Sequence, residues 1–173
     1  MEFILFRFRF VETKQKMTKT LTLDEKEARK LYPSASPEFK ALLDQNFGKD
    51  FFSGKITDRI KTWEDVCAES GVDPDDEEYT EGEPDEIAYS KIKLITKVLN
   101  EGWKPNWNNI NQCKWYPWFY MNNPGFRLYV SYYYIGGTYD GTGARLCFSS
   151  RELSDYAANT FLELYKQFMT NGD

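Results

Sequence analysis

The sequence contains no histidine, and this absence narrows the chemistry available to the chain. Serine–histidine and cysteine–histidine nucleophile pairs, histidine-ligated metals and the commonest general base are all excluded. The three cysteines, Cys67, Cys113 and Cys147, are widely spaced and form no C-x-x-C pair of the kind that binds zinc. We therefore expect reduced core cysteines, no metal site and no cofactor.

Long apolar segments are missing as well. No stretch is apolar over the roughly eighteen residues that a membrane span requires. The N-terminal MEFILFRFRF lacks the apolar run and the small-residue cleavage site of a signal peptide. These features predict a cytoplasmic protein without a membrane partner. At 173 residues the chain is long enough for one compact domain with or without an appendage.

Positive charge is absent from one segment. Residues 73–86 carry nine carboxylates and no Lys or Arg, whereas the whole chain has 22 basic and 27 acidic side chains. The remainder therefore has 22 basic against 18 acidic residues, a net charge of +4. Like charges together with Pro and Gly oppose regular structure, which predicts a solvated acidic linker at residues 72–86. Whether this segment folds back onto a basic surface stays open.

Local sequence signals divide the rest of the chain. Residues 1–16 are interpreted as an N-terminal extension before a second start at Met17, and their Phe/Arg alternation is typical of a β-strand. Cap and stop residues predict short helices in a helical region at residues 17–71. Residues 87–173 form the predicted aromatic-rich α+β domain, opened by one longer helix that ends at Gly102.

After Gly102 the hydrophobic pattern changes from helical to alternating. Segments 114–121, 126–135 and 144–148 are rich in Trp, Tyr, Phe and Val and are separated by the turn sequences NNPG and GGTYDGTG. They predict a three-stranded antiparallel meander. Ser149 and Glu152 make a capping box for a C-terminal helix, which we expect to pack on the sheet. The predicted fold class is α+β.

Alternation along the second strand predicts two faces with different roles. The core side carries Phe126, Leu128 and Val130. The outward side carries Arg127, Tyr129, Ser131 and Tyr133, with Arg145 beside them on the third strand.

Aromatic and basic residues gather in and around this predicted sheet. Aromatic rings stack on bases at roughly 1–3 kcal/mol each, and Arg or Lys binds phosphate. The predicted helix N-terminus after the sheet adds hydroxyls and free amides for an anion. The same residues also suit core, edge and capping positions. The candidate ligand-binding residues are Trp107, Lys114, Trp115, Trp118, Arg127, Tyr129, Tyr133, Arg145, Ser149, Ser150 and Arg151.

Sequence blocks that follow Met17 resemble a family of uncharacterised small proteins of phages that infect gut Bacteroidales, including crAss-like phages, and of related prophages. The most specific blocks are LNEGW-x-P-x-W and RLCF-S-x-E-L. The resemblance implies a phage or mobile-element gene product in a bacterial host cell, and it implies no activity. Family members often carry Lys at the position of Ser149, which weakens this residue as a fixed phosphate contact.

Three hypotheses of function follow. The first is a non-catalytic phage accessory protein that binds nucleic acid or a nucleotide signal of host defence through the aromatic and basic sheet face. The second is a protein-interaction or virion-associated module that binds a host or phage protein through the same face, with a homo-oligomer left open. The third, a carboxylate-dependent enzyme, has the weakest basis, because the isolated Glu101, Asp140 and Asp155 form no acid/base pair in the sequence.

Overall fold

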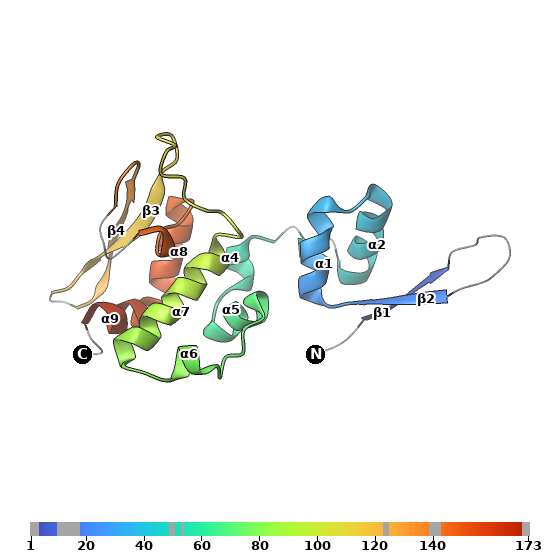
Figure 1. Ribbon diagram of the computed structural model, residues 1–173, viewed down its shortest axis with the longest axis horizontal. Coiled ribbons are helices and arrows are strands. Elements are labelled where there is room, and N and C mark those ends of the chain that lie inside the picture. Colours follow the sequence, from blue (N-terminus) through green and yellow to red (C-terminus); the bar gives the residue numbers. More distant parts are fainter. Residues whose placement is uncertain are drawn as a thin grey trace. The chain divides into compact units, whose positions relative to one another are not determined.

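The computed structural model describes residues 4–9, 18–48, 51–52, 54–122, 125–138 and 143–170. The chain divides into an N-terminal unit, residues 1–54, and a C-terminal unit, residues 55–173, each with a hydrophobic core of its own (Figure 1). The boundary thus falls at residue 54 and not in the acidic segment. Within the described ranges, no helix combines the length and the apolar character that crossing a membrane would require.

The N-terminal unit is a β-hairpin followed by helices. The hairpin runs antiparallel from the pair Ile4–Leu23 to the pair Arg9–Thr18, so a strand is present within the predicted extension and pairs with the segment after Met17. Residues 1–3 and 10–16 of that extension lie outside the described residues. The elements are β1 (Ile4–Arg9), β2 (Thr18–Leu23), α1 (Glu25–Leu31), η1 (Tyr32–Ser34) and α2 (Pro37–Phe47).

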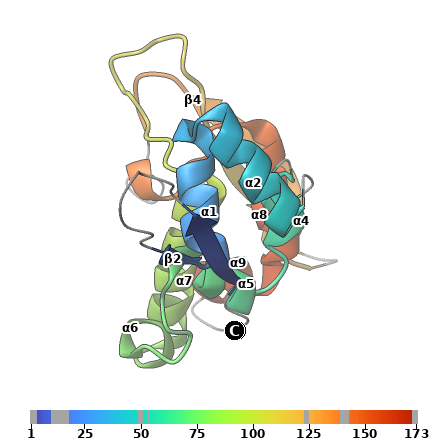
Figure 2. The same cartoon turned by 90° about the vertical axis from the view of Figure 1, so that its right-hand side faces the viewer.

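A small aromatic core joins the two helices of this unit; Figure 2 shows the ribbons of α1 and α2 in a second view. Ala28 of α1 and Leu43 of α2 are fully buried. The Tyr32 ring stacks on Phe52 with 4.0 Å between centroids, and its hydroxyl donates to Asp44 at 2.9 Å. This hydrogen bond raises the pKa of Tyr32, because it favours the protonated hydroxyl.

The C-terminal unit is organised around its longest helix, α7. The residues Ala88, Ile92, Ile95 and Leu99 recur at helical spacing and bury one side of α7 in the core. The elements of the unit are α4 (Ile56–Arg59), α5 (Trp63–Ser70), α6 (Glu77–Thr80), α7 (Pro84–Leu99), β3 (Lys114–Tyr120), β4 (Arg127–Tyr134), η2 (Gly143–Arg145), α8 (Arg151–Thr160) and α9 (Leu162–Thr170).

The acidic segment is folded into this unit and is not a free linker. Asp76 caps α6 by accepting a hydrogen bond from the Glu78 amide at 2.9 Å. Tyr79 is buried against Trp63, with 5.1 Å between ring centroids. Lys93 of α7 pairs with Glu78 at 3.0 Å. One buried aromatic ring and one ion pair therefore hold α6 alongside α7 (Figure 1) despite the run of like charge.

β3 and β4 form a two-stranded antiparallel sheet, and the predicted third strand is wrong. Residues 143–145 form η2, and Phe148 pairs with Trp115 through an isolated bridge of two backbone hydrogen bonds, 2.9 and 2.7 Å long. Three consecutive residues, 146–148, are buried, so this segment lacks the alternating exposure of a strand with one solvent-facing side. The bridge lies beside β3, whereas a meander places its third strand beside β4. Parts of both predicted turns, residues 123–124 and 139–142, lie outside the described residues.

A β-bulge changes which residues of β4 face the core. Trp118 pairs with Val130 while Phe119 pairs with Leu128, so Tyr129 is the extra residue. Beyond it the alternation is shifted by one position. The predictions for three residues are therefore wrong: Ser131 and Tyr133 lie on the side of α8 instead of facing outward, and Val130 shares the face of Trp118 instead of joining the core.

The predicted C-terminal helix is interrupted at Phe161, where the backbone leaves helical geometry and α8 gives way to α9. α8 packs on both strands, as expected, whereas α9 packs on α7. A buried hydrogen bond of 2.7 Å between the hydroxyls of Ser131 and Ser154 joins β4 to α8. The N-cap of α8 is Ser150, one residue later than predicted.

Asn100, at the C-terminal end of α7, connects that helix to the segment before α8. Its buried amide donates from Nδ2 to the Cys147 carbonyl and accepts at Oδ1 from the Ser149 amide, both at 2.9 Å. The Asn100 side chain thus provides hydrogen-bond partners for the Cys147 carbonyl and the Ser149 amide, which have none in a neighbouring strand.

Lys114 fastens the loop between α7 and β3. Its side chain is fully buried, and Nζ donates to the carbonyls of Asn109, Gln112 and Ile135 at 3.2, 2.7 and 2.9 Å. The Trp107 ring lies 5.4 Å from Nζ. The ammonium group therefore supplies the hydrogen bonds of three carbonyl groups, two in the loop before β3 and one just after β4.

Replacing Asn100 should destabilise the C-terminal unit strongly. We expect Asn100→Ala to lower its free energy of unfolding by about 3 kcal/mol, because the Cys147 carbonyl and the Ser149 amide lose their partner. Urea unfolding followed by tryptophan fluorescence measures this, since all five tryptophans lie in this unit. The exposed Asn108→Ala is the matched control, and equal stability of the two variants would contradict the role of Asn100.

Lys114→Met tests whether the ammonium group is structural. Met keeps most of the side-chain volume but leaves three carbonyls without their donor, so we expect a loss of about 3 kcal/mol in the same urea experiment. The exposed Lys104→Met should change the stability by less than about 0.5 kcal/mol. A Lys114→Met variant as stable as the parent would show that these hydrogen bonds are dispensable.

Candidate functional site

The face of the sheet turned away from α8 carries a row of interacting rings. Tyr116 stacks on Tyr134 with 4.3 Å between centroids, and Trp118 meets Tyr132 edge-on at 5.8 Å. Next along the strands, the bulge residue Tyr129 lies 4.4 Å from Tyr120. The outer face, defined here as Trp118, Tyr120, Tyr129, Tyr132 and Arg127, is thus a continuous aromatic surface.

Exposed apolar surface is concentrated around these strands. Ten large apolar or aromatic side chains are exposed in the described part of the chain, and seven of them belong to β3, β4 or the residue next to a strand end. Apolar side chains exposed together in one patch usually mark an interaction surface, whereas single exposed apolar residues are common on any protein. The seven are Trp118, Tyr120, Met121, Tyr129, Tyr132, Tyr133 and Ile135.

Positive charge on the outer face is sparse. The two strands contain two cationic residues, Lys114 and Arg127, and Lys114 is buried. The Arg127 guanidinium lies 4.2 Å above the Tyr120 ring and donates to the Gly125 carbonyl at 3.1 Å. Nucleic-acid binding depends on several contacts between cations and phosphate groups, and the outer face offers one cation among its five residues.

The predicted site residues do not form one site. Trp118, Arg127 and Tyr129 lie on the outer face. Trp115 and Tyr133 pack together on the side of α8, with 4.9 Å between ring centroids. Trp107 lies beside the buried Lys114, which fastens the loop between α7 and β3. The last four residues lie beyond the strands: Arg145 ends η2, and Ser149, Ser150 and Arg151 lead into α8.

The predicted anion position at the start of α8 is already in use. The Ser150 hydroxyl accepts a hydrogen bond from the Leu153 amide at 3.2 Å, and Ser149 donates its amide to Asn100. Arg151 pairs with Asp155 at 3.5 Å. Hydrogen bonds from the backbone amide of Glu152 itself and from the Ser150 hydroxyl lower the pKa of the Glu152 carboxyl group. A carboxylate of this chain therefore already occupies the positive end of the α8 helix dipole.

A cleft beside α7 brings together residues that the sequence places far apart. It has a volume of about 680 Å³ and lies between α6, the second half of α7, the turn that follows α7, and η2. It is referred to below as the α7 cleft. Its lining comprises Glu78, Tyr79, Lys93, Leu94, Thr96, Lys97, Asn100, Gly102, Trp103, Lys104, Pro105, Ala144 and Arg145.

The α7 cleft is positively charged in a protein of net charge −5. Its lining has four cations, Lys93, Lys97, Lys104 and Arg145, against one carboxylate, Glu78. Glu78 pairs with Lys93. Among the described residues, no carboxylate lies within 4.0 Å of the charged groups of the other three cations, which are all exposed. These three charges are available to an anionic ligand.

The turn after α7 positions the aromatic part of the cleft. Glu101 and Gly102 both have positive φ angles, 45° and 86°, which reverse the chain at the end of the helix. Arg59 holds Glu101 through an ion pair of 3.2 Å, and the Trp103 amide donates to the Asn100 carbonyl at 2.8 Å. As a result the partly exposed Trp103 ring lines the same cleft as Lys97 and Arg145.

One polar group in the wall of the cleft has no hydrogen-bond partner in the described structure. Thr96 is 2% exposed, and its Oγ1 is unpaired. Buried hydroxyl groups are usually hydrogen-bonded, so an unpaired one beside a charged cleft suits a position that a ligand or water completes. Asn100 lies in the same wall with both amide atoms already bonded.

Most residues of the α7 cleft are not among the predicted site residues. Arg145 was predicted on a strand, and the candidate ligand-binding residues did not include Lys93, Lys97, Trp103 or Lys104. A sequence signal was present: Lys93 and Lys97 are spaced i, i+4 on one face of a helix, and Trp103-Lys104 follows its stop residue. What the sequence could not show is that η2 returns to this end of α7.

The cysteines and carboxylates supply little reactive chemistry in the described residues. Cys67 and Cys147 are buried, and Cys113 is partly exposed. Burial raises the pKa of Cys147 to about 11, which keeps its thiol protonated near neutral pH. In the described part of the chain, no group of three or more Cys, Asp or Glu side chains is arranged to hold a metal ion.

Comparisons with known proteins add no family to this description. No protein-family model matches the chain, and neither a curated protein nor a solved structure matches it.

Proposed function

We propose that the protein is a non-catalytic binding protein for a nucleotide-type ligand, and that the α7 cleft is its binding site. The observation that carries the proposal is the juxtaposition of Lys97, Lys104 and Arg145, three cations without a carboxylate partner among the described residues, with the Trp103 ring. The sequence-based hypothesis had the same ligand class but placed it on the sheet.

The chemistry of the cleft suits both halves of a nucleotide. A phosphate group accepts charge-assisted hydrogen bonds from Lys and Arg, and a base stacks on an aromatic ring. The cleft volume of about 680 Å³ lies within the range typical of small-ligand sites. The outer face of the sheet has the rings but a single cation, the partly exposed Arg127, so the phosphate part favours the cleft.

In this proposal the chain is a phage accessory protein of the bacterial cytoplasm that binds a nucleotide and does not catalyse its conversion. The sole carboxylate of the cleft lining, Glu78, is paired with Lys93 and has no second carboxylate in the lining to share acid/base work with. No histidine is available to replace it. Binding alone accounts for the residues of this site.

Arg145→Gln should weaken nucleotide binding. Calorimetric titration of the full chain with AMP, a cyclic dinucleotide, adenosine and inorganic phosphate identifies which part of the ligand is bound. For the nucleotide that binds, we expect Arg145→Gln to raise Kd about tenfold or more, because one charge-assisted hydrogen bond is lost. Binding should also weaken as salt is added.

Arg151→Gln is the matched control, since it removes the same charge at the start of α8. An unchanged Kd for Arg145→Gln with a raised Kd for Arg151→Gln would move the site to that helix. A lack of binding by every member of the panel at low salt would contradict the proposed function itself.

Glu78→Gln should have the opposite effect. Removing this carboxylate frees Lys93 and makes the lining more positive by one charge, so we expect the Kd for the same nucleotide to fall severalfold. Glu77→Gln, on the same short helix but outside the cleft lining, removes the same charge and is the control. Equal effects of the two variants would indicate a long-range charge effect and not a local contact.

A further inference from the structure

The lining of the α7 cleft combines several cations with one accessible ring. Lys97, Lys104 and Arg145 come from α7, from the turn after it and from η2, and all three are exposed. The described lining has two aromatic rings, of which Tyr79 is buried and Trp103 is partly exposed. One accessible ring offers a stacking position for one base, whereas three cations offer contacts for more than one phosphate group.

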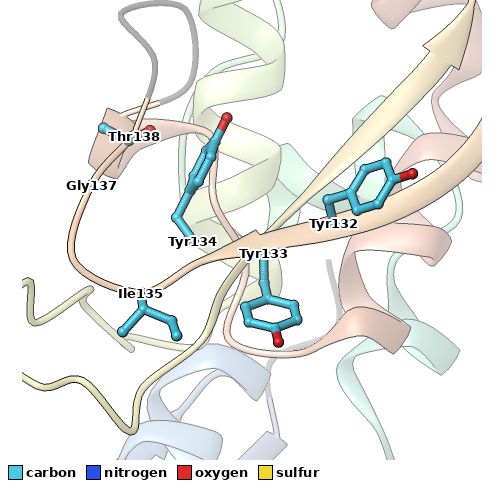
Figure 3. Close-up of a pocket in the computed structure, with 6 residues that line it drawn as sticks. All are labelled: Tyr132, Tyr133, Tyr134, Ile135, Gly137 and Thr138. Atoms are coloured by element: carbon cyan, nitrogen blue, oxygen red, sulfur yellow. The ribbon is translucent and has the colours of Figure 1, made fainter.

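A second hollow of similar size shows how far the cations distinguish the α7 cleft. Figure 3 shows this β4 hollow at the end of β4, with a volume of about 690 Å³ against about 680 Å³ for the cleft. Its described lining, residues 132–135, 137 and 138, has three tyrosines and no charged side chain. A ligand held by stacking alone would therefore suit the β4 hollow, whereas an anionic ligand suits the cleft.

The number of free cations in the cleft bears on the number of phosphate groups in its ligand. A terminal phosphate group carries roughly −1.5 to −2 charges at pH 7, so a nucleoside monophosphate leaves at least one of the three cations unmatched. A cyclic dinucleotide has one charge on each of its two phosphodiester groups and also presents two bases to one ring. A second phosphate group in a chain adds a negative charge, and a nucleoside diphosphate thus matches all three cations.

The charge of the lining also bears on magnesium, which usually accompanies nucleoside polyphosphates in proteins and is held partly by carboxylates. The one carboxylate of the described lining, Glu78, is paired with Lys93 at 3.0 Å. A divalent cation on the phosphate groups would instead meet Lys97, Lys104 and Arg145, and it would neutralise charges that these side chains attract. The cleft therefore favours a polyphosphate without the metal ion.

A buried hydroxyl group in the same wall indicates a ligand independently of the charges. Thr96 directly precedes Lys97 on α7 and is 2% exposed, and its Oγ1 has no hydrogen-bond partner among the described residues. A hydroxyl group can donate to a phosphate oxygen and accept from a base. Because buried hydroxyl groups are usually hydrogen-bonded, the wall of the cleft is incomplete without a bound group.

We propose that the ligand of the α7 cleft is a nucleoside polyphosphate, with two or more phosphate groups on one nucleoside, bound without a divalent metal ion. The base stacks on Trp103, and the phosphate chain lies among Lys97, Lys104 and Arg145. This inference rests on the proposed function, because it specifies the ligand of the same site. It goes beyond that function in ranking nucleoside monophosphates and cyclic dinucleotides as weaker ligands.

Calorimetric titration of the full chain with the mono-, di- and triphosphates of adenosine and guanosine tests the number of phosphate groups. In buffer with EDTA, we expect the diphosphate of the base that binds to have a Kd about tenfold or more below that of its monophosphate, because one more charge-assisted contact forms. The cyclic dinucleotide of that base should bind no more tightly than the monophosphate. Excess Mg²⁺ should raise the Kd of the di- and triphosphates severalfold.

Lys97→Gln should reduce the preference for the diphosphate, and Lys91→Gln is its matched control. Both variants remove one positive charge from α7, but Lys91 does not line the cleft. We expect the ratio of the monophosphate Kd to the diphosphate Kd to fall severalfold in Lys97→Gln and to stay unchanged in Lys91→Gln. An unfolded fraction would lower the binding stoichiometry for both ligands alike and would leave this ratio unchanged.

Trp103→Leu and Tyr132→Leu locate the base. The first variant should raise the diphosphate Kd about tenfold through the loss of stacking, and the second, in the β4 hollow, should leave it unchanged. A monophosphate that binds as tightly as the diphosphate, an unchanged ratio in Lys97→Gln or tighter binding with Mg²⁺ would each overturn this inference while the cleft remained a nucleotide site. A chain that binds none of these compounds would overturn the proposed function as well.

Discussion

The C-terminal unit depends on one buried amide. Asn100 ends α7 and at the same time bonds both the Cys147 carbonyl and the Ser149 amide, 47 and 49 residues away in the sequence. The segment around Cys147 has no regular strand partner, so without this side chain its backbone groups would be buried unpaired. η2, which precedes this segment, is thereby held against the end of α7. The α7 cleft exists because those two elements are kept together.

The helices could be predicted from local sequence because their ends are encoded locally. In α2, Ser36 caps the helix and Pro37 takes its first position, and in α5, Thr62 and Asp65 form a capping box. Helix interruptions and short helices were harder to predict: Phe161 ends α8 within an uninterrupted apolar pattern. α6 forms within a run of carboxylates because Tyr79 is buried against Trp63, a long-range contact that outweighs the local repulsion.

The sheet shows why alternation alone misplaces residues. A single extra residue, Tyr129, shifts every later position of β4 to the other face, and no local feature of the sequence announces it. The shift has a cause in packing. It brings the Ser131 hydroxyl to Ser154 of α8 and keeps Phe126 and Leu128 in the core. The predicted third strand failed for a related reason: residues 143–145 form η2, and residues 146–148 are buried on both sides, so exposure does not alternate along the segment.

Rings and charges that are mixed in the sequence are separated in space, and this separation bears on what each surface can bind. Lys114, one of the two cations on the strands, is buried and donates its hydrogen bonds to three backbone carbonyls. The outer face is therefore aromatic and carries little charge. Such a face suits another polypeptide, where Tyr, Trp and Arg are enriched. Four other cations, Lys93, Lys97, Lys104 and Arg145, line the cleft together with Trp103, and there the acidic segment supplies one wall and pairs Glu78 with Lys93. At physiological salt, charges are screened beyond about 8 Å. An anion that reaches the cleft is therefore influenced chiefly by its cations, and the acidic surface of the protein affects the rate of its arrival more than the stability of the complex.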